Sequence, residues 1–197
     1  MTQILVVGED ELCCALGERL VGACLPGWVF ASESINTRGV TKLKAALPRY
    51  LNYAEHVRPV LCVADTDGRC PVEWLEEALP DRGDAPLLLR LAVTEAESWV
   101  LADGEAFANV FGVARNRLPR DPDSIQDAKR HVLNLVHHSR SRVIRNEMVS
   151  SLDSSKTGSG YNVHLCGFVR AHWRAHQAAE RSSSLGSAVR RLKALGA

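Results

Sequence analysis

The sequence has few of the features that mark membrane, secreted or zinc-stabilised proteins. It contains no long uncharged apolar run, and the apolar stretch at residues 4–7 is too short for the core of a signal peptide. Its 6 cysteines include no C-x-x-C pair, and their spacing matches no common set of zinc ligands. These absences predict a cytoplasmic protein whose cysteines are reduced thiols and which holds no structural zinc.

A strong net charge is also missing, but the balance of +1 conceals an asymmetry. Residues 1–114 carry 9 Lys and Arg against 17 Asp and Glu, a balance of −8, whereas residues 115–197 carry 15 against 6, a balance of +9. This pattern fits an acidic, metal-binding half joined to a half that faces a polyanionic substrate. The alternative is two sets of solvated helix faces that attract each other.

Hydrophobic periodicity predicts an α/β domain followed by helices. Strands are expected at residues 4–8, 28–35, 60–64 and 86–93, of which the last two are apolar enough to be buried. Helices are expected at residues 9–23, 40–56, 71–79, 95–102, 105–111, 124–138, 140–149, 162–176 and 184–195, with a loop at 80–84. We expect residues 1–103 to form an α/β domain with a mostly parallel four-stranded sheet flanked by helices, and residues 104–197 to form a basic helical extension packed on it.

Two aspartates one residue apart follow the third expected strand. This apolar strand ends at Asp65-Thr66-Asp67-Gly68. In open parallel sheets, ligands bind at the carboxyl ends of the strands, where the loops splay apart. A site hypothesis therefore begins at Asp65 and Asp67. The alternative is a surface turn whose aspartates cap their own backbone.

A second group of acids, Glu9-Asp10-Glu11, follows the first expected strand. Acidic side chains at the start of a helix have a structural explanation, because the helix N-terminus carries a partial positive charge. However, the ends of the first and third strands can lie side by side in a parallel sheet, which would bring Glu9 close to Asp65 and Asp67. Three carboxylates there would suit a hard divalent cation such as Mg²⁺.

The junction after the fourth strand, Thr94-Glu95-Ala96-Glu97, adds two more acids. It fits a capping box, in which Glu97 would reach back to the backbone at Thr94, and this is a structural role. The same position places Glu95 and Glu97 at the carboxyl end of a strand. They would then add negative charge to the same crevice.

A long polar loop, residues 150–161, interrupts the helices of the second half. Long loops in compact domains are usually functional or disordered. Lys156 and the nearby hydroxyls and glycines could hold a phosphate through side-chain charge and backbone amides. The order of glycine and lysine is not that of a Walker loop. The alternative is a flexible linker.

The combined motifs resemble the Toprim fold shared by topoisomerases, primases and the overcoming-lysogenization-defect (OLD) nucleases. The Toprim pattern is a glutamate directly after strand one and an Asp-x-Asp after strand three, here Glu9 and Asp65-Thr66-Asp67. Segments 90–103, 115–127 and 158–161 extend the resemblance to a small Toprim-like family often found beside ATPases of the SMC or AAA type in phage-defence loci.

The resemblance implies a metal-dependent phosphodiesterase that cleaves nucleic acid, DNA in preference to RNA. Glu9 would be a metal ligand or general acid/base, Asp65 and Asp67 ligands of Mg²⁺ or Mn²⁺, and Glu97 a further ligand. Lys156 resembles the lysine that neutralises transition-state charge in OLD-type nucleases. The OLD pattern has a second glutamate one helical turn after the first, where this chain has Cys13, so the resemblance leaves one or two metal ions open.

Two hypotheses for the function follow. The first is a Mg/Mn-dependent endonuclease of antiviral defence that acts with an ATPase partner, as a single chain or a homo-oligomer, with nucleic-acid contacts from Arg140, Arg142, Arg145 and Lys156. The second is a non-catalytic regulatory subunit that binds an ATPase system through its basic helical half. A phosphoacceptor domain resembling response-regulator receivers would need a lysine on a fifth strand, which the sequence does not predict.

Overall fold

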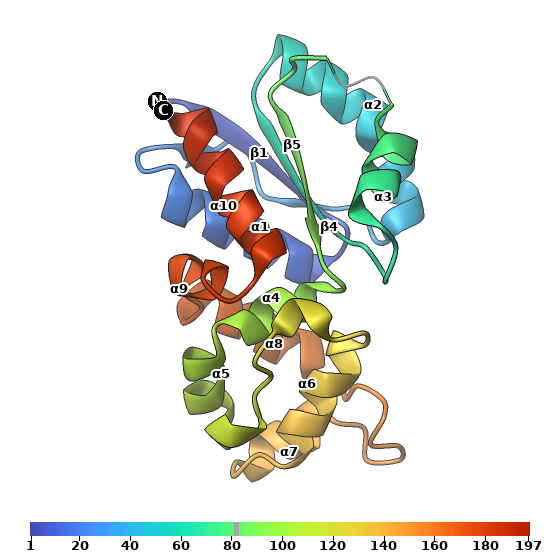
Figure 1. The fold of residues 1–197 in the computed structure, drawn as a ribbon, viewed down its shortest axis with the longest axis vertical. Helices are drawn as coiled ribbons and strands as arrows, with labels where there is room; N and C mark the ends of the chain where they lie inside the picture. The colour runs from blue at the N-terminus through green and yellow to red at the C-terminus, as the bar shows by residue number, and fades with distance from the viewer. Residues whose placement is uncertain (81–82) are drawn as a thin grey trace.

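A parallel sheet forms the centre of the first half of the chain (Figure 1). The computed structural model describes residues 1–80 and 83–197, so positions 81 and 82 of the expected loop lie outside the described residues. The strand order is β2-β1-β4-β5, with β3 also paired to β1, and all of these pairs are parallel. The strands are β1 (Gln3–Gly8), β2 (Val29–Phe30), β3 (Ile35–Asn36), β4 (Val60–Asp65) and β5 (Leu87–Ala92).

The single strand expected at residues 28–35 is wrong, because the chain forms the short strands β2 and β3 there. Both pair with β1, but the register shifts between them: Ile4 lies opposite Phe30, and Val7 lies opposite Ile35. The residues between the strands are mostly polar and bond elsewhere. The Ser34 hydroxyl, for example, donates to Glu18. Such side-chain hydrogen bonds compete with a continuous ladder, so the sheet has five strands where four were expected.

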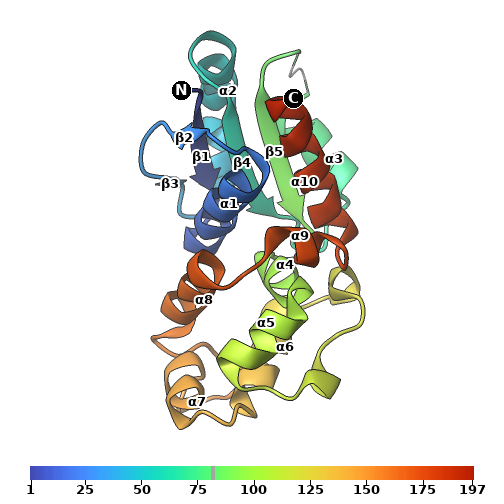
Figure 2. The ribbon, with the colours of Figure 1, turned by 90° about the vertical axis from the view of Figure 1, so that its left-hand side faces the viewer.

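Different helices cover the two faces of the sheet (Figure 1, Figure 2). Ile4 and Val6 of β1 enter the core on one face, and Leu5 and Val7 enter the core on the other, as the alternation of side chains along a strand requires. The last helix of the chain therefore belongs to the sheet layers. The covering helices are α1 (Glu11–Cys24) and α10 (Ser183–Gly196) on the first face, and α2 (Val40–His56) and α3 (Pro71–Ala78) on the second.

The carboxyl ends of the strands point toward a group of helices that we call the helical lobe, residues 104–171 (Figure 1, Figure 2). It is joined to the sheet by α4 and followed by α9. The helices of the lobe are α5 (Gly104–Phe111), α6 (Ala128–His137), α7 (Arg142–Met148) and α8 (Tyr161–Ala171), with 3-10 turns at η1 (Arg115–Arg117) and η2 (Pro122–Ser124). The flanking helices are α4 (Ala96–Ala102) and α9 (Ala175–Ala179).

Two expected helices differ from the observed ones for identifiable reasons. The helix expected from residue 124 begins at Ala128, because the Asp127 carboxylate caps it by accepting from the Arg130 amide at 2.7 Å. The helix expected at 162–176 is divided into α8 and α9. Asp103 accepts hydrogen bonds from the Arg174 amide and guanidinium, and this holds the chain in a break between the two helices.

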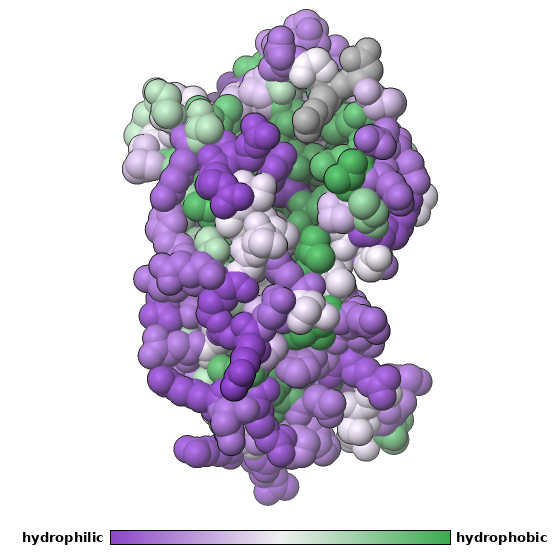
Figure 3. Space-filling view, in the orientation of Figure 1, coloured by the Kyte–Doolittle hydropathy of each residue, from purple (hydrophilic) through white to green (hydrophobic). Residues whose placement is uncertain are grey.

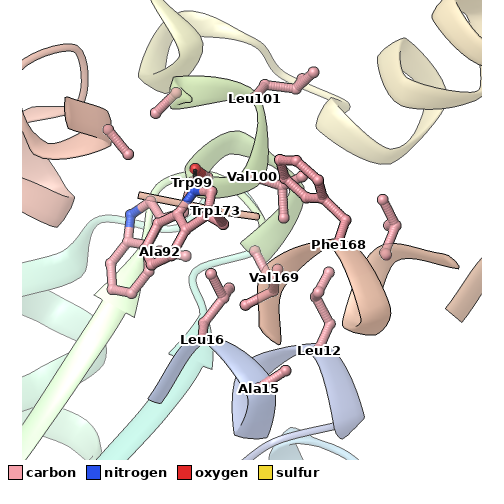
Figure 4. Close-up of a cluster of buried hydrophobic side chains, with 14 of the residues drawn as sticks. Leu12, Ala15, Leu16, Ala92, Trp99, Val100, Leu101, Phe168, Val169 and Trp173 are labelled. Atoms are coloured by element: carbon pink, nitrogen blue, oxygen red, sulfur yellow. Dashed lines mark hydrogen bonds between the residues drawn. The ribbon is translucent and has the colours of Figure 1, made fainter. Parts of the chain in front are cut away.

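A buried aromatic cluster connects α4 with α1 and α8 (Figure 4). The indole of Trp173 donates to the Trp99 carbonyl at 2.9 Å, and the indole of Trp99 donates to the Ser184 hydroxyl at 2.8 Å. Every residue of α4 is buried. This packing fixes the first turn of α4 directly below the sheet. No helix in the described ranges is both long and apolar enough to cross a membrane.

Candidate functional site

The carboxyl edge of the sheet brings Glu9 and Asp65 together. β1 and β4 are neighbours, with Gly8 opposite Val63, so the residues that follow the two strands meet. The Asp65 amide donates to Glu9 Oε2 at 3.1 Å. Glu9 precedes α1, and Asp10 caps that helix by accepting from the Cys13 amide at 2.8 Å. The structural explanation for an acid at a helix start therefore applies to Asp10 and not to Glu9.

The Asp65-Thr66-Asp67-Gly68 turn is anchored to the neighbouring strand end. The amides of Thr66 and Asp67 both donate to the Thr94 carbonyl, at 3.2 and 3.0 Å. Asp67 has a φ of 50°, a left-handed conformation that aspartate tolerates better than most residues, and its side chain is exposed. Within the described residues, neither Asp65 nor Asp67 accepts a hydrogen bond from an amide of its own turn. The surface-turn explanation therefore does not account for these two side chains.

Burial and mutual repulsion perturb the carboxyls at this edge. Burial raises the pKa of Asp65 well above its usual range, and the charges of Glu97 and Glu9 raise it further. Burial also raises the pKa of Glu9, and the charge of Asp67 raises it further. The hydrogen bond from the Asp65 amide opposes this increase only in part. The group thus brings together acids that disfavour one another's ionisation. A bound cation would reverse these shifts, because it favours the ionised carboxylates.

Glu97 occupies the first turn of α4 but does not form the expected capping box. The N-cap residue is Glu95, and the Thr94 hydroxyl donates to the Ile125 carbonyl at 2.7 Å instead of capping the helix. The side chain of Glu97, only 6% exposed, accepts from the Tyr161 hydroxyl at 3.0 Å. Burial raises the pKa of Glu97 to about 7, and the charge of Lys129 partly opposes this. Glu97 is therefore a buried, electrostatically costly acid beside Asp65.

Cys13 lies in the first turn of α1, close to Asp65. Its thiol approaches Asp65 Oδ1, with a sulfur–oxygen distance of 3.7 Å. Burial raises the pKa of the thiol, and the charge of Asp65 raises it further, so Cys13 is a neutral thiol in contact with that carboxylate. The position adds no further oxygen ligand.

The start of α6 is docked against the end of β5. The Lys129 amide donates to Glu95 Oε2 at 2.9 Å, next to the contact between Thr94 and Ile125. The Lys129 ammonium lies 5.6 Å from the centre of the Tyr161 ring, the same residue that donates to Glu97. Lys129 and Tyr161 were not predicted as site residues, because Lys129 lies in an ordinary helical pattern and Tyr161 ends the polar loop in segment 158–161, which supports the resemblance without giving Tyr161 a role. Only the fold brings them to the acids.

Lys129 and Arg130 of α6 line a hollow of about 600 Å³ together with Lys156 and its neighbours Ser155 and Thr157. We call this hollow the basic groove. Of the predicted nucleic-acid contacts, only Lys156 lies in it, with its ammonium 3.8 Å from Asp153. The three predicted arginines lie elsewhere. Arg142 is exposed at the start of α7, Arg145 donates to the Ser139 carbonyl and lines a separate hollow, and Arg140 lines another beside Arg115.

The polar loop at residues 150–161 is folded back on the end of α7. Val149 and Thr157 form an antiparallel bridge, and the amides of Gly158 and Gly160 donate to the carbonyls of Met148 and Glu147, each at 2.9 Å. The flexible-linker interpretation is therefore wrong. Because these glycine amides are used within the protein, they are also not available to hold a phosphate. What the loop contributes to the groove is side chains, among them Lys156.

The edge has the donor chemistry of a hard-cation site, namely the carboxylates of Glu9, Asp65, Asp67 and Glu97. In residues 1–80 and 83–197, however, no group of three or more His, Cys, Asp or Glu side chains is arranged so that it could hold a metal ion. Glu9 Oε2 is bonded to the Asp65 amide, and the Asp67 side chain is exposed. Coordination by three carboxylates would therefore require these two side chains to turn.

Comparisons with known proteins add no relative. No protein-family model, no curated protein and no solved structure matches this chain. The function has to be inferred from the residues and their arrangement.

Proposed function

We propose that this protein is a Toprim-type phosphodiesterase that cleaves nucleic acid with the help of Mg²⁺ or Mn²⁺. The observation that carries the proposal is the group of acids at the carboxyl edge of the parallel sheet, where the amide of the half-buried Asp65 donates to Glu9 and the charges of Glu97, Glu9 and Asp67 raise the pKa of Asp65. Natural proteins rarely retain buried charges that repel one another unless a ligand or a reaction uses them. The edge of the sheet is also where open α/β folds bind their ligands.

Asp65 and Asp67 would hold the cation, with Glu9 and Glu97 as further ligands. When bound, such a cation polarises a phosphoryl oxygen and lowers the pKa of a coordinated water molecule. Side chains of the protein would supply the other catalytic functions. Glu9 can move a proton at Oε2, Tyr161 orients Glu97 through its hydroxyl, and the positive charge of Lys129 offsets negative charge that develops beside Glu97.

The proposed setting is antiviral defence in the cytoplasm, with an ATPase of the SMC or AAA type as partner. It rests on the resemblance of segments 90–103, 115–127 and 158–161 to the small Toprim-like family.

A second candidate function is a non-catalytic regulatory subunit of such an ATPase system. Two observations favour it: Cys13 replaces the second glutamate of the OLD pattern, and the carboxylates are not arranged as a finished metal site. On this alternative, the acids shape the surface and the basic helical half binds the partner.

Plasmid nicking distinguishes the two functions. The native chain, purified Asp67→Asn and a matched control, Asp84→Asn, are incubated with supercoiled DNA and Mn²⁺. Asp84 is exposed and precedes β5, so it lies at the opposite edge of the sheet. We expect nicking by the native chain and by Asp84→Asn, and at least a 100-fold loss, about the effect of removing a group essential to the chemistry, in Asp67→Asn. Equal nicking in all three, or none in any, would reject the nuclease.

A further inference from the structure

The basic groove is charged on two sides by separate parts of the chain. Lys129 and Arg130 lie in the first turn of α6, and Lys156 lies in the loop that folds back on α7. The lining has one acid, Asp127, whose Oδ1 accepts from the Arg130 amide as the cap of α6. Among the described residues, three cations and one carboxylate line the hollow, and the Lys156 ammonium also lies 3.8 Å from Asp153 outside the lining. The surface is suited to an anion.

The groove leads to the acidic edge through Lys129. This residue lines the groove and lies over the Tyr161 ring, and the Tyr161 hydroxyl donates to Glu97 at 3.0 Å. Contacts therefore connect the groove with Glu97 through Lys129 and Tyr161. A polyanion that lies in the groove would extend to the carboxylates, whereas a single phosphate ion would fill only a small part of the hollow.

The rest of the helical lobe contributes less to such a path. On the face shown in Figure 3 its surface is largely hydrophilic. Arg140 and Arg145 line two other hollows, and neither of these includes Lys129, the cation that lies over the Tyr161 ring. Arg115 is engaged with Glu105, at 3.2 Å.

We propose that the basic groove binds the phosphodiester backbone of nucleic acid and leads it to the carboxylates, with Lys129 and Arg130 as principal contacts beside Lys156. The identity of the polyanion rests on the proposed function. The choice of surface rests on the groove itself. This proposal replaces the expectation that Arg140, Arg142 and Arg145 form the main nucleic-acid contact.

The test is fluorescence anisotropy of a labelled 20-nucleotide DNA probe, single-stranded and as a duplex, with the full chain in EDTA. The variants are Lys129→Ala/Arg130→Ala and the matched control Arg140→Ala/Arg142→Ala, which removes the same charge from exposed positions outside the groove. Loss of two phosphate contacts weakens binding about 25- to 60-fold at 0.1 M salt and reduces the salt slope by about 1.4 to 1.8. The control changes neither quantity by more than a small part of that.

A larger loss in the control than in the groove variant, or no DNA binding by the native chain, would overturn the proposal. Circular dichroism shows whether the double variant is folded. Arg130→Ala alone is the second variant, because the cap of α6 uses only the backbone amide of Arg130. Since the assay needs neither a divalent ion nor cleavage, its failure is separate from failure of the metal site, which is measured by Mn²⁺ binding to the same variants.

Discussion

Replacing Glu97 by glutamine should make the protein more stable at alkaline pH while removing an acid from the site. The carboxyl of Glu97 is buried and has a pKa of about 7 in the folded chain, against an ordinary value of 4.5. Holding it ionised in the fold therefore costs about 3 kcal/mol at pH 8. Glutamine retains an oxygen that accepts from the Tyr161 hydroxyl, so the variant escapes this cost without losing that hydrogen bond.

The sign of the pH dependence follows from the direction of the shift. Because the folded-state pKa is raised, the stabilising contribution of the protonated carboxyl is complete below about pH 4.5 and is lost as the pH rises through 7. We expect the native chain and Glu97→Gln to have similar free energies of unfolding at pH 4.5, and the variant to be more stable by about 2 to 3 kcal/mol at pH 8.

Urea denaturation in EDTA, followed by tryptophan fluorescence, measures this difference, since Trp99 and Trp173 are fully buried near Glu97. The matched control is Glu76→Gln, an exposed residue of α3, which should leave the pH dependence unchanged. A variant that is no more stable than the native chain at pH 8, or that shows the same dependence on pH, would refute the view that Glu97 is a costly buried acid.

Three further predictions concern other parts of the fold. Asp103→Ala removes the partner of Arg174 from a site where burial would raise the pKa of Asp103 but the Arg174 hydrogen bonds lower it. We expect a loss of about 2 to 3 kcal/mol at pH 7 in urea denaturation, which becomes smaller as the pH falls from the ordinary pKa of aspartate through the lowered pKa of the folded chain; a loss that does not decrease over this range would contradict this. Gly158→Ala places a Cβ 2.3 Å from the Glu147 carbonyl oxygen, which is too close for the loop to keep its position. Thermal unfolding should therefore show a destabilisation of about 1 to 3 kcal/mol. An unchanged Tm would show that the loop is not held against Glu147. Asp67→Asn should change the free energy of unfolding by less than about 0.5 kcal/mol, because the residue is exposed and asparagine also tolerates its positive φ. A large loss of stability in urea denaturation would show that Asp67 is a structural residue.

The sequence predicts the sheet well where its signals are local. The continuous apolar runs of β1, β4 and β5 indicate strands buried on both faces, and parallel pairing then places Glu9 beside Asp65. It fails at residues 28–35, where the polar side chains between β2 and β3 bond away from the ladder. A periodicity signal averages over such a break and cannot locate it.

The residues of the candidate site likewise fall into those that the sequence predicts and those that only the packing of the fold reveals. Glu9, Asp65 and Asp67 follow strands directly, so their position can be predicted from the order of the elements. Tyr161 and Lys129 cannot be predicted so, because they approach Glu97 only through the packing of α6 and α8 on α4. The local sequence also predicts a capping role for Glu97 that the fold does not use, because the Thr94 hydroxyl donates to the Ile125 carbonyl instead.

The most direct test of the central claim is isothermal titration calorimetry of Mn²⁺ binding at pH 8 to the native chain and to Asp65→Asn/Asp67→Asn. If the acidic edge is a cation site, the native chain binds Mn²⁺ and the folded double variant binds it at least 10-fold more weakly, the loss of about 1.4 kcal/mol or more expected when charged ligands are removed. Equal binding by both chains, or no binding by the native chain, would contradict the account and leave Asp65 and Asp67 without a metal to hold.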